Sequence, residues 1–402
     1  MHPEDWDRLI HRRLLGLADR NLFRRRRVVR HLDATHVEID GRRYVNFASN
    51  NYLGLSHHPR VLQAAAEALH ADGAGAGASP LVTGYTPAHE SAERRIAAWK
   101  GTEASVLLPS GYQANVAAVQ ALTAVGQGGD EGPTAVRFLL DKLVHASLVD
   151  AVRQTGAPFR VFPHNNLEKL SRLIEEADAG QLQVVVTESI FSMDGDAAPL
   201  DDLAALKQRG RGFLLLLDEA HASGVYGPAG AGLAAEIGLA GLADVTVVTL
   251  SKALGCAGGA ICASRAFCDA VVNLGRAYLY STALPPSVAA AAEAAIRVLS
   301  DEPQHQQRLL RLRQWVGRAL RDAGLQIPGD DSPIIPVILG NEEAALAAAS
   351  RLADAGLWVT AIRPPTVARG TSRLRITLSS AHTDAEIEGL LMSVKALGAG
   401  GP

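Results

Sequence analysis

The sequence predicts an α/β protein in which helices cover a mostly parallel central sheet, with a short N-terminal arm before it and a smaller α+β unit after it. Three observations predict this fold class. Short apolar runs alternate with helical segments between about residues 60 and 285, the pattern changes beyond about residue 285, and the first 30 residues place apolar and basic positions at helical spacing. We therefore expect an arm and hairpin over residues 1–45, a large α/β domain over 46–285 and an α+β domain over 286–402.

The composition excludes several protein classes. The 402 residues are 48% hydrophobic and 20% charged, with a formal net charge of −3, which is unlike collagen-like, disulfide-scaffold or disordered sequences. No apolar run approaches the roughly 20 residues that span a bilayer, and the first residues hold acids and arginines where a signal peptide needs an apolar stretch. The cysteines, Cys256, Cys262 and Cys268, lack the spacing of a zinc or redox pair. We expect a cytoplasmic protein with no metal and no membrane segment.

The N-terminal segment is expected to form a helical arm that packs on a larger surface. It ends in an arginine run from Arg24 to Arg27. The following segment, HVEIDGRRYVNF at 36–47, alternates polar and apolar residues on both sides of Asp40-Gly41, which predicts a tight hairpin. A nucleic-acid-binding arm is the alternative interpretation of the arginine run, but the net charge of −3 and the lack of interleaved aromatic residues disfavour it.

The middle of the chain supplies the strands and helices of the expected sheet. Nearly continuous apolar runs are typical of strands that are covered on both faces. The runs that we interpret as strands are ASVLLP at 104–109, VRFLLD at 136–141, QVVVTESI at 183–190, GFLLLLDEA at 212–220 and DVTVVTL at 244–250. The segments of the same part of the chain that we interpret as helices include 61–71, 90–100 and 201–210.

The last part of the chain mixes both periodicities. Helical stretches are expected at 286–300, at 304–323, near 342–356 and at the end of the chain, and strands at 333–339, 357–362 and 373–378. This mixture predicts an α+β unit.

Polar residues that abruptly end buried strands are the first candidates for a site, because ligands of such sheets bind beyond the carboxyl ends of the strands. Asp218 ends one run, with His221 three residues later, and Thr249, Ser251 and Lys252 end another. Each pair has an ordinary structural explanation. A capping aspartate beside a packed histidine is as common as a functional pair, and a lysine at a strand end usually extends to solvent.

Two further segments have the same double interpretation. Ser110-Gly111-Tyr112 lies between a strand and a helix, where backbone N–H groups and the helix dipole suit a phosphate. His145 follows another strand. Each alone is more often an ordinary turn or a structural histidine.

Taken together, these sites fit pyridoxal phosphate (PLP). Its aldehyde needs a lysine amine, its phosphate needs N–H and hydroxyl donors, and its ring nitrogen needs a carboxylate that keeps it protonated. An ion pair near 4 Å in a partly buried site is worth on the order of 4 kcal/mol, which is enough for an acid such as Asp218 to hold the ring charged. The glycine-rich segment GAGAGAS at 73–79 lacks the G-x-G-x-x-G spacing of a dinucleotide site. A nicotinamide cofactor is therefore not expected.

Motifs along nearly the whole chain resemble the α-oxoamine synthases, PLP enzymes of the aminotransferase-like fold type I. The segments that carry the resemblance are NFASNNYLGLSHHP at 46–59, GYTPAHE at 84–90, PSGYQAN at 109–115, HASLVDA at 145–151, TESIFSMDGDAAPL at 187–200, DEAHASGVYG at 218–227, TLSKALG at 249–255, YSTALPP at 280–286 and VTAIRPPTV at 359–367. Two segments depart from the usual family pattern, Ala78-Ser79-Pro80 and Gly230-Ala231-Gly232.

The resemblance implies a role for each matching residue. Lys252 would bond to the cofactor's aldehyde, His145 would stack on its ring, Asp218 would pair with its nitrogen and His221 would lie beside its phenolic oxygen. Further cofactor contacts are expected from Ser110, Gly111, Tyr112, Glu188, Ser192, Thr249 and Ser251. Substrate contacts are expected from Arg363, which would hold the amino-acid carboxylate, and from Thr366, Asn50, His145 and Arg24, the last at the acyl donor's end.

The resemblance also implies a reaction and partners. Members whose motifs look like VTAIRPPTV and GTSRLRITLSSAHT condense L-alanine with a pimeloyl thioester, carried by coenzyme A or an acyl-carrier protein, and release CO2 and the free thiol. Members that use glycine or serine are the close alternative, and aminotransfer or decarboxylation on the same fold is a more distant one. A homodimer is expected as the working unit.

Overall fold

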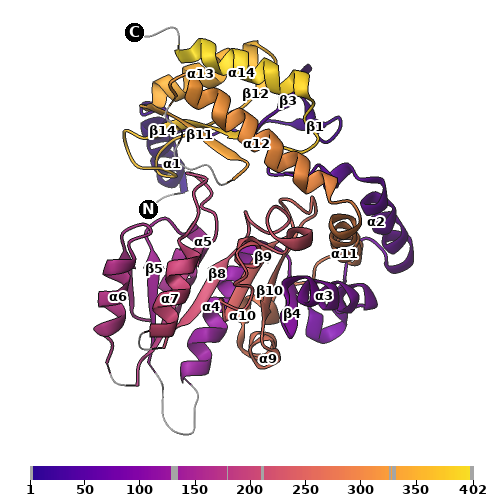
Figure 1. The fold of residues 1–402 in the computed structure, drawn as a ribbon, viewed down its shortest axis with the longest axis vertical. Helices are drawn as coiled ribbons and strands as arrows, with labels where there is room; N and C mark the ends of the chain where they lie inside the picture. Colours follow the sequence, from indigo (N-terminus) through magenta and orange to yellow (C-terminus); the bar gives the residue numbers. More distant parts are fainter. Residues whose placement is uncertain are drawn as a thin grey trace.

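The computed structural model describes residues 3–127, 135–178, 180–209, 212–325, 327 and 332–398. A large lobe is built around one sheet, and a smaller lobe joins the C-terminal elements to the N-terminal hairpin (Figure 1). No helix of the described residues is both long and apolar enough to cross a membrane. The division at 45/46 and 285/286 stays a prediction, and α11 (Pro286–Asp301) packs on α2 (Pro59–Asp72) and α3 (Pro87–Lys100) of the large lobe.

A seven-stranded sheet forms the centre of the large lobe, in the order β4-β10-β9-β8-β7-β5-β6. Its strands are β4 (Ala104–Leu108), β5 (Val136–Asp141), β6 (Phe159–Phe162), β7 (Leu182–Glu188), β8 (Leu214–Asp218), β9 (Val245–Thr249) and β10 (Gly259–Ala263). The five predicted strands are confirmed, whereas β6 and β10 were not predicted. The sheet is mostly parallel as expected, because only β10 runs antiparallel to its neighbours β4 and β9.

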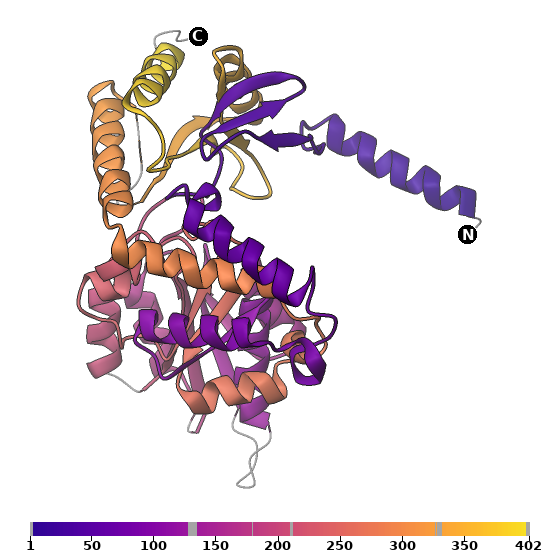
Figure 2. The same cartoon turned by 90° about the vertical axis from the view of Figure 1, so that its right-hand side faces the viewer.

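Helices cover both faces of this sheet (Figures 1 and 2). Besides α2, α3 and α11 they are α4 (Gly111–Gln127), α5 (Ala146–Thr155), α6 (Leu167–Glu175), α7 (Leu200–Arg209), α8 (Leu233–Glu236), α9 (Arg265–Leu274) and α10 (Arg276–Leu279). The predicted helices at 61–71 and 90–100 are confirmed, and so is the one at 201–210 except for its last residue, which lies outside the described part of the chain. Two of the cysteines, Cys262 and Cys268, are buried among these elements.

The described residues of the small lobe form two sheets, and three helices pack with them. One sheet has the order β1-β2-β3-β12 and the other β11-β14-β13. The strands are β1 (Val29–His31), β2 (His36–Ile39), β3 (Arg42–Asn46), β11 (Ile334–Gly340), β12 (Leu357–Trp358), β13 (Thr360–Ile362) and β14 (Ser372–Thr377), and the helices are α12 (Gln304–Asp322), α13 (Glu342–Asp354) and α14 (Asp384–Gly398). The predicted hairpin is confirmed, with φ of +52° at Asp40 and +76° at Gly41.

The N-terminal helix α1 (Pro3–Ala18) projects from the small lobe (Figure 2). Its apolar side chains are exposed, Trp6 by 59% and Leu15 by 64%. The expectation that the arm packs on a larger surface is therefore not met within a single copy of the chain.

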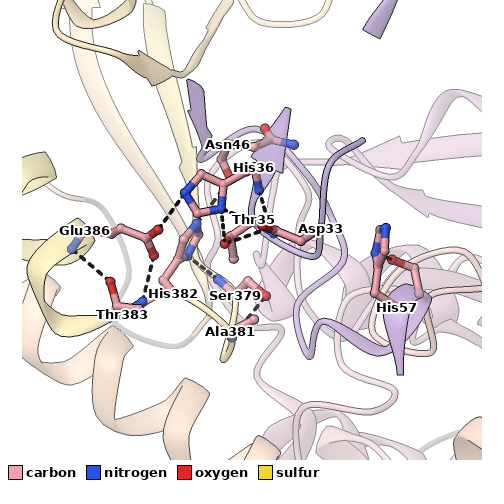
Figure 3. Close-up of polar contacts among 11 residues, drawn as sticks. Asp33, Thr35, His36, Asn46, His57, Ser379, Ala381, His382, Thr383 and Glu386 are labelled. Carbon is pink, nitrogen blue, oxygen red and sulfur yellow. Dashed lines mark hydrogen bonds and ion pairs between the residues drawn. The ribbon is translucent and has the colours of Figure 1, made fainter. Parts of the chain in front are cut away.

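A polar cluster ties the N-terminal hairpin to the start of α14 (Figure 3). His36 lies between Asp33 and Glu386, with ring nitrogens 3.0 Å from each carboxylate. The buried His382 ring accepts from the Ser379 N–H at 3.0 Å and lies 3.2 Å from the Asn46 carbonyl oxygen. Burial lowers the pKa of His382 to about 4, although the hydrogen bond to Asn46 opposes that shift.

Acid should weaken the fold through His382. An unfolded histidine titrates near pH 6.5, so a native pKa of about 4 means that the unfolded chain binds the proton first. The contribution is fully present above about pH 6.5 and is lost as the pH falls toward 4, at most on the order of 3 kcal/mol. We expect His382→Gln to lose less unfolding free energy between pH 7 and pH 4.5 than the wild type, as measured by urea denaturation. The exposed His70→Gln should behave as wild type, and an equal loss in all three proteins would contradict the role of His382.

Candidate active site

The carboxyl ends of three parallel strands bring the predicted residues to one edge of the large sheet. Glu188 ends β7 and pairs in register with Asp218, which ends β8, while Asp218 pairs with Val247 of β9. Lys252 lies three residues beyond the end of β9. The polar residues that seemed unrelated along the sequence therefore meet because neighbouring strands end together.

Lys252, His221 and Tyr52 form a chain of hydrogen bonds in which His221 and Tyr52 are buried and Lys252 is half-buried. The Lys252 Nζ lies 2.7 Å from His221 Nε2, and the Tyr52 hydroxyl lies 2.5 Å from His221 Nδ1. The turn after Lys252 packs closely on the segment after Tyr52, since a side chain at Gly255 (φ +67°) would meet the backbone N of Ser56 at 2.2 Å. The lysine turn therefore requires glycine at this position.

Burial lowers the pKa values of Lys252 and His221. It lowers the pKa of Lys252 to about 8, a shift that Asp218 and Glu188 oppose and that Arg375 adds to. It also lowers the pKa of His221 well below its ordinary value, with further contributions from Lys252 and Arg375. The arrangement holds a neutral imidazole against an amine that loses its proton near physiological pH.

His145 stands on the other side of the carboxylates. Its backbone N–H donates to Glu188, and its ring Nδ1 lies 2.8 Å from the Ser147 hydroxyl. Asp218 accepts from the Asn115 amide at 2.8 Å and from the Ala220 N–H at 2.9 Å. Burial, and then the negative charge of Asp218, raise the pKa of Glu188 well above its usual range. The two carboxyl groups are therefore close enough for the charge of Asp218 to disfavour that of Glu188.

The strand-to-helix turn at Ser110 has the tight packing of an anion cradle. A side chain on Gly111 would lie 2.3 Å from Thr249 Oγ1, and one on Gly259 would lie 2.6 Å from the Gly111 Cα. The Ser110 hydroxyl accepts from the Gln113 N–H at 3.1 Å at the start of α4. The N-terminus of a long helix and the Thr249 hydroxyl thus lie together, which fits the phosphate of the expected cofactor.

Three residues that the sequence analysis did not single out belong to this cluster: Tyr52, Asn115 and Arg375. The buried Arg375 on β14 donates to the Ser192 carbonyl at 2.7 Å and to Asn50 Oδ1 at 3.2 Å. It thereby brings the expected residues Asn50 and Ser192 to the site from two distant segments. The signal for Arg375 was available, because an arginine inside a buried apolar strand requires polar partners.

Several expected substrate contacts lie farther out. Arg363 donates to the Asn21 carbonyl oxygen, and both burial and the positive charge of Arg24 lower its pKa. Thr366 lies on the exposed turn that follows and lines a cavity of about 300 Å³ together with Ser192. The Tyr112 hydroxyl donates to Asp150 at 3.0 Å. Ser251 is exposed next to Lys252.

A buried ion pair supports the turn after Asp218. Lys100 Nζ donates to Glu219 Oε2 at 2.5 Å, and both side chains are 3% exposed. Lys100 also donates to the carbonyl of Ala231, one of the positions that departs from the family pattern, and Glu219 accepts from the Ala234 N–H at 3.1 Å. The consecutive side chains of Asp218 and Glu219 therefore contact different groups, since Asp218 accepts from Asn115 and Glu219 accepts from Lys100.

Comparison with known proteins agrees with this geometry. The family model described as aminotransferase class I and II matches residues 42–394. An 8-amino-7-oxononanoate synthase from Anaeromyxobacter dehalogenans is 45% identical over 361 residues, 90% of this chain and 88% of that protein. One from Maricaulis maris is 43% identical over 392 residues, 97% of this chain and 96% of that protein.

Solved structures give the same fold. A serine palmitoyltransferase from Sphingomonas wittichii is 30% identical and superposes with a TM-score of 0.89 over 98% of this chain and 97% of that one. A structure of SPT with PLP is 31% identical, with a TM-score of 0.90 over 98% of both chains. The chain therefore has the fold type I architecture of PLP-dependent transferases and belongs to the 8-amino-7-oxononanoate synthase family.

Proposed function

We propose that the chain is a PLP-dependent acyltransferase of biotin biosynthesis that condenses L-alanine with a pimeloyl thioester to give 8-amino-7-oxononanoate, CO2 and the free thiol. The observation that supports this most directly is the Lys252 amine, whose pKa burial lowers to about 8 beside Asp218 and His221. Identity of 43–45% with relatives of that name over most of both chains supports the choice of substrates.

Different residues of the chain would bind different parts of the cofactor. Asp218, fixed by Asn115 and Ala220, would hold a proton on the ring nitrogen of the cofactor, and His145 would stack on the ring. His221 would hydrogen-bond to the phenolic oxygen, while Gly111, Tyr112 and Thr249 would hold the phosphate. Ser110, Glu188, Ser192 and Ser251 complete the surroundings. The bound cofactor supplies an electron sink next to the Cα of the amino acid.

Lys252 moves the proton of the reaction. Its amine, neutral near pH 8, takes the proton from Cα of alanine, as a general base with a pKa close to the working pH does. The new bond joins Cα to the acyl carbon as the thiolate leaves, and the carboxylate of alanine then leaves as CO2. His145 polarises the new ketone, and Lys252 returns the proton to Cα.

Two arginines are candidates for holding the alanine carboxylate. Arg363 has this role by resemblance, with Thr366 beside it and Arg24 at the acyl donor's end. A specific observation favours Arg375, because its guanidinium contacts Asn50 and its charge acts on both Lys252 and His221.

We further propose that the protein acts as a homodimer in the cytoplasm. The exposed apolar face of α1, with Trp6 and Leu15, supports a second copy of the chain as its partner, since isolated exposed helices of this kind seldom stand alone. The related reactions with glycine or serine remain the alternative, and nucleic-acid binding through the Arg24 to Arg27 run is the distant one.

The purified, PLP-loaded protein is expected to release thiol from a pimeloyl thioester when alanine is added, and less than a tenth as fast with glycine or serine. Lys252→Ala should lose turnover by at least a thousandfold together with the visible absorbance of the bound cofactor. The exposed Lys395→Ala on α14 should retain both. Equal rates with serine would favour the alternative reaction, and a near-native rate in Lys252→Ala would remove this residue from catalysis.

The capture of PLP by the unloaded protein should depend on pH through Lys252. The neutral amine reacts, so the rate should rise with pH through about 8, where an ordinary lysine would do so above pH 10. Asp218→Asn removes a charge that raises this pKa, and should move the midpoint to lower pH; Arg375→Gln should move it higher. Stopped-flow absorbance measures the midpoints, with the exposed Asp269→Asn as a control. Shifts in the same direction for both variants would contradict the proposed electrostatics.

Conservative substitutions show which of the two arginines, Arg363 or Arg375, binds the alanine carboxylate. If Arg375 holds the carboxylate, Arg375→Lys loses bidentate geometry and should raise the KM for alanine at least tenfold, about 1.4 kcal/mol. Arg363→Lys should then raise it less than threefold. Steady-state kinetics at saturating thioester gives both values, and the opposite ranking would return the role to Arg363.

A further inference from the structure

An arginine-lined groove lies between α1 and the turn that follows Arg363. It has a volume of about 760 Å³, and its lining includes Arg13, Arg20 and Arg369, with Glu342 as its acidic residue. None of these three arginines forms an ion pair with another described residue; Arg20 donates only to the Gly16 carbonyl, at 2.7 Å. The groove therefore concentrates uncompensated positive charge, which favours an anionic ligand.

The groove adjoins a smaller cavity that borders residues next to the active site. Val367 lines both this groove and the smaller cavity of about 300 Å³, whose other lining residues include Val144 and Ser192. Val144 directly precedes His145, and the Ser192 carbonyl accepts from Arg375. A ligand that extends past Val367 would therefore place one end near Ser192 and the residue before His145, and the other among the arginines.

The wall of the smaller cavity is apolar at Leu143, Phe191 and Met193. Its charged lining residues are Lys142, Asp194 and Arg373, and the last two neutralise each other in an ion pair at 2.5 Å. A ligand that fits both cavities has a reactive end, a flexible uncharged middle and an anionic end. The acyl donor of the proposed reaction has this form, since a phosphopantetheine arm joins its thioester to a phosphate. Three guanidinium groups suit phosphate oxygens, which arginine binds in a bidentate manner, and exceed what the single terminal carboxylate of a pimeloyl chain requires.

We propose that the groove of Arg13, Arg20 and Arg369 binds the phosphate end of the acyl donor's phosphopantetheine arm. The inference rests on the proposed function and adds to it a binding site for the donor's carrier. Coenzyme A and a carrier protein share this phosphate, so the groove recognises their common part.

The test compares thioesters with and without phosphate. In the variant Arg13→Gln/Arg20→Gln/Arg369→Gln, the KM for pimeloyl-coenzyme A should rise at least tenfold, while the KM values for pimeloyl-pantetheine and alanine should stay within twofold. Both thioesters keep the terminal carboxylate. An equal rise for both would assign the groove to that carboxylate, or reveal general damage, and overturn the proposal; so would no change for either. A parallel rise for the carrier-protein thioester would identify the shared phosphate. A rise for coenzyme A alone would assign the groove to the nucleotide phosphates and overturn the proposal.

Direct binding gives a readout that does not depend on turnover. Calorimetry with the PLP-loaded protein should show coenzyme A binding that weakens with added salt and is lost at least tenfold in the triple variant, and no pantetheine binding at the same concentration. The matched single variants Arg13→Gln and Arg12→Gln, adjacent on α1, should differ, because Arg12 does not line the groove. Salt-dependent coenzyme A binding that the triple variant loses, without pimeloyl turnover, would refute the proposed reaction but support the phosphate site in the groove. Pimeloyl turnover together with unchanged coenzyme A binding in the triple variant would support the reaction but refute the phosphate site.

Discussion

The desolvation of one amine governs the arrangement of this site. Lys252 is buried enough that its pKa falls to about 8, and it stays there only because Asp218 and Glu188 oppose the shift. A buried ammonium without such neighbours would cost several kcal/mol. Arg375, which lies in the small lobe, lowers the pKa of Lys252 and so opposes the effect of these carboxylates. The two lobes therefore set the proton affinity of the same amine, and a change in how they sit would change it.

The fold provides this balance through the ends of its strands. Parallel β7, β8 and β9 place a glutamate, an aspartate and a threonine at one edge, and the single antiparallel strand β10 brings Gly259 against Gly111. Because no side chain fits at either glycine, the start of α4 approaches Thr249 closely. The same edge thus has carboxylates that would suit a protonated ring nitrogen and a positive helix end that would suit a phosphate.

The central strands and most of the site residues could be predicted from the sequence. The strands and residues that were missed have physical reasons for it. The five central strands are continuous apolar runs, so their polar ends stood out. Strands β6 (burial mixed along FRVF) and β10 (small residues, GAICA) give weak signals. Tyr52 resembled a core aromatic. Arg375 lies in an apolar strand, which indicates that it needs polar partners but not which residues these are. Their role depends on contacts between segments more than 160 residues apart, Tyr52 with His221 and Arg375 with Asn50, which no local pattern contains.

The neighbouring acids Asp218 and Glu219 show how the chain keeps two buried charges from interfering. Asp218 and Glu188 raise the pKa of Lys252, whereas Glu219, which follows Asp218 directly, pairs with Lys100. Alternation along the extended chain directs the two side chains to opposite sides, and Lys100 neutralises Glu219 at 2.5 Å with both side chains buried. The paired acid can therefore hold the turn in place through Lys100 and Ala234, while the Asp218 carboxylate remains available to the ring nitrogen. Removing Lys100 would leave a second uncompensated carboxylate near the site, so the ion pair protects the electrostatics of Lys252 as well as the shape of the turn.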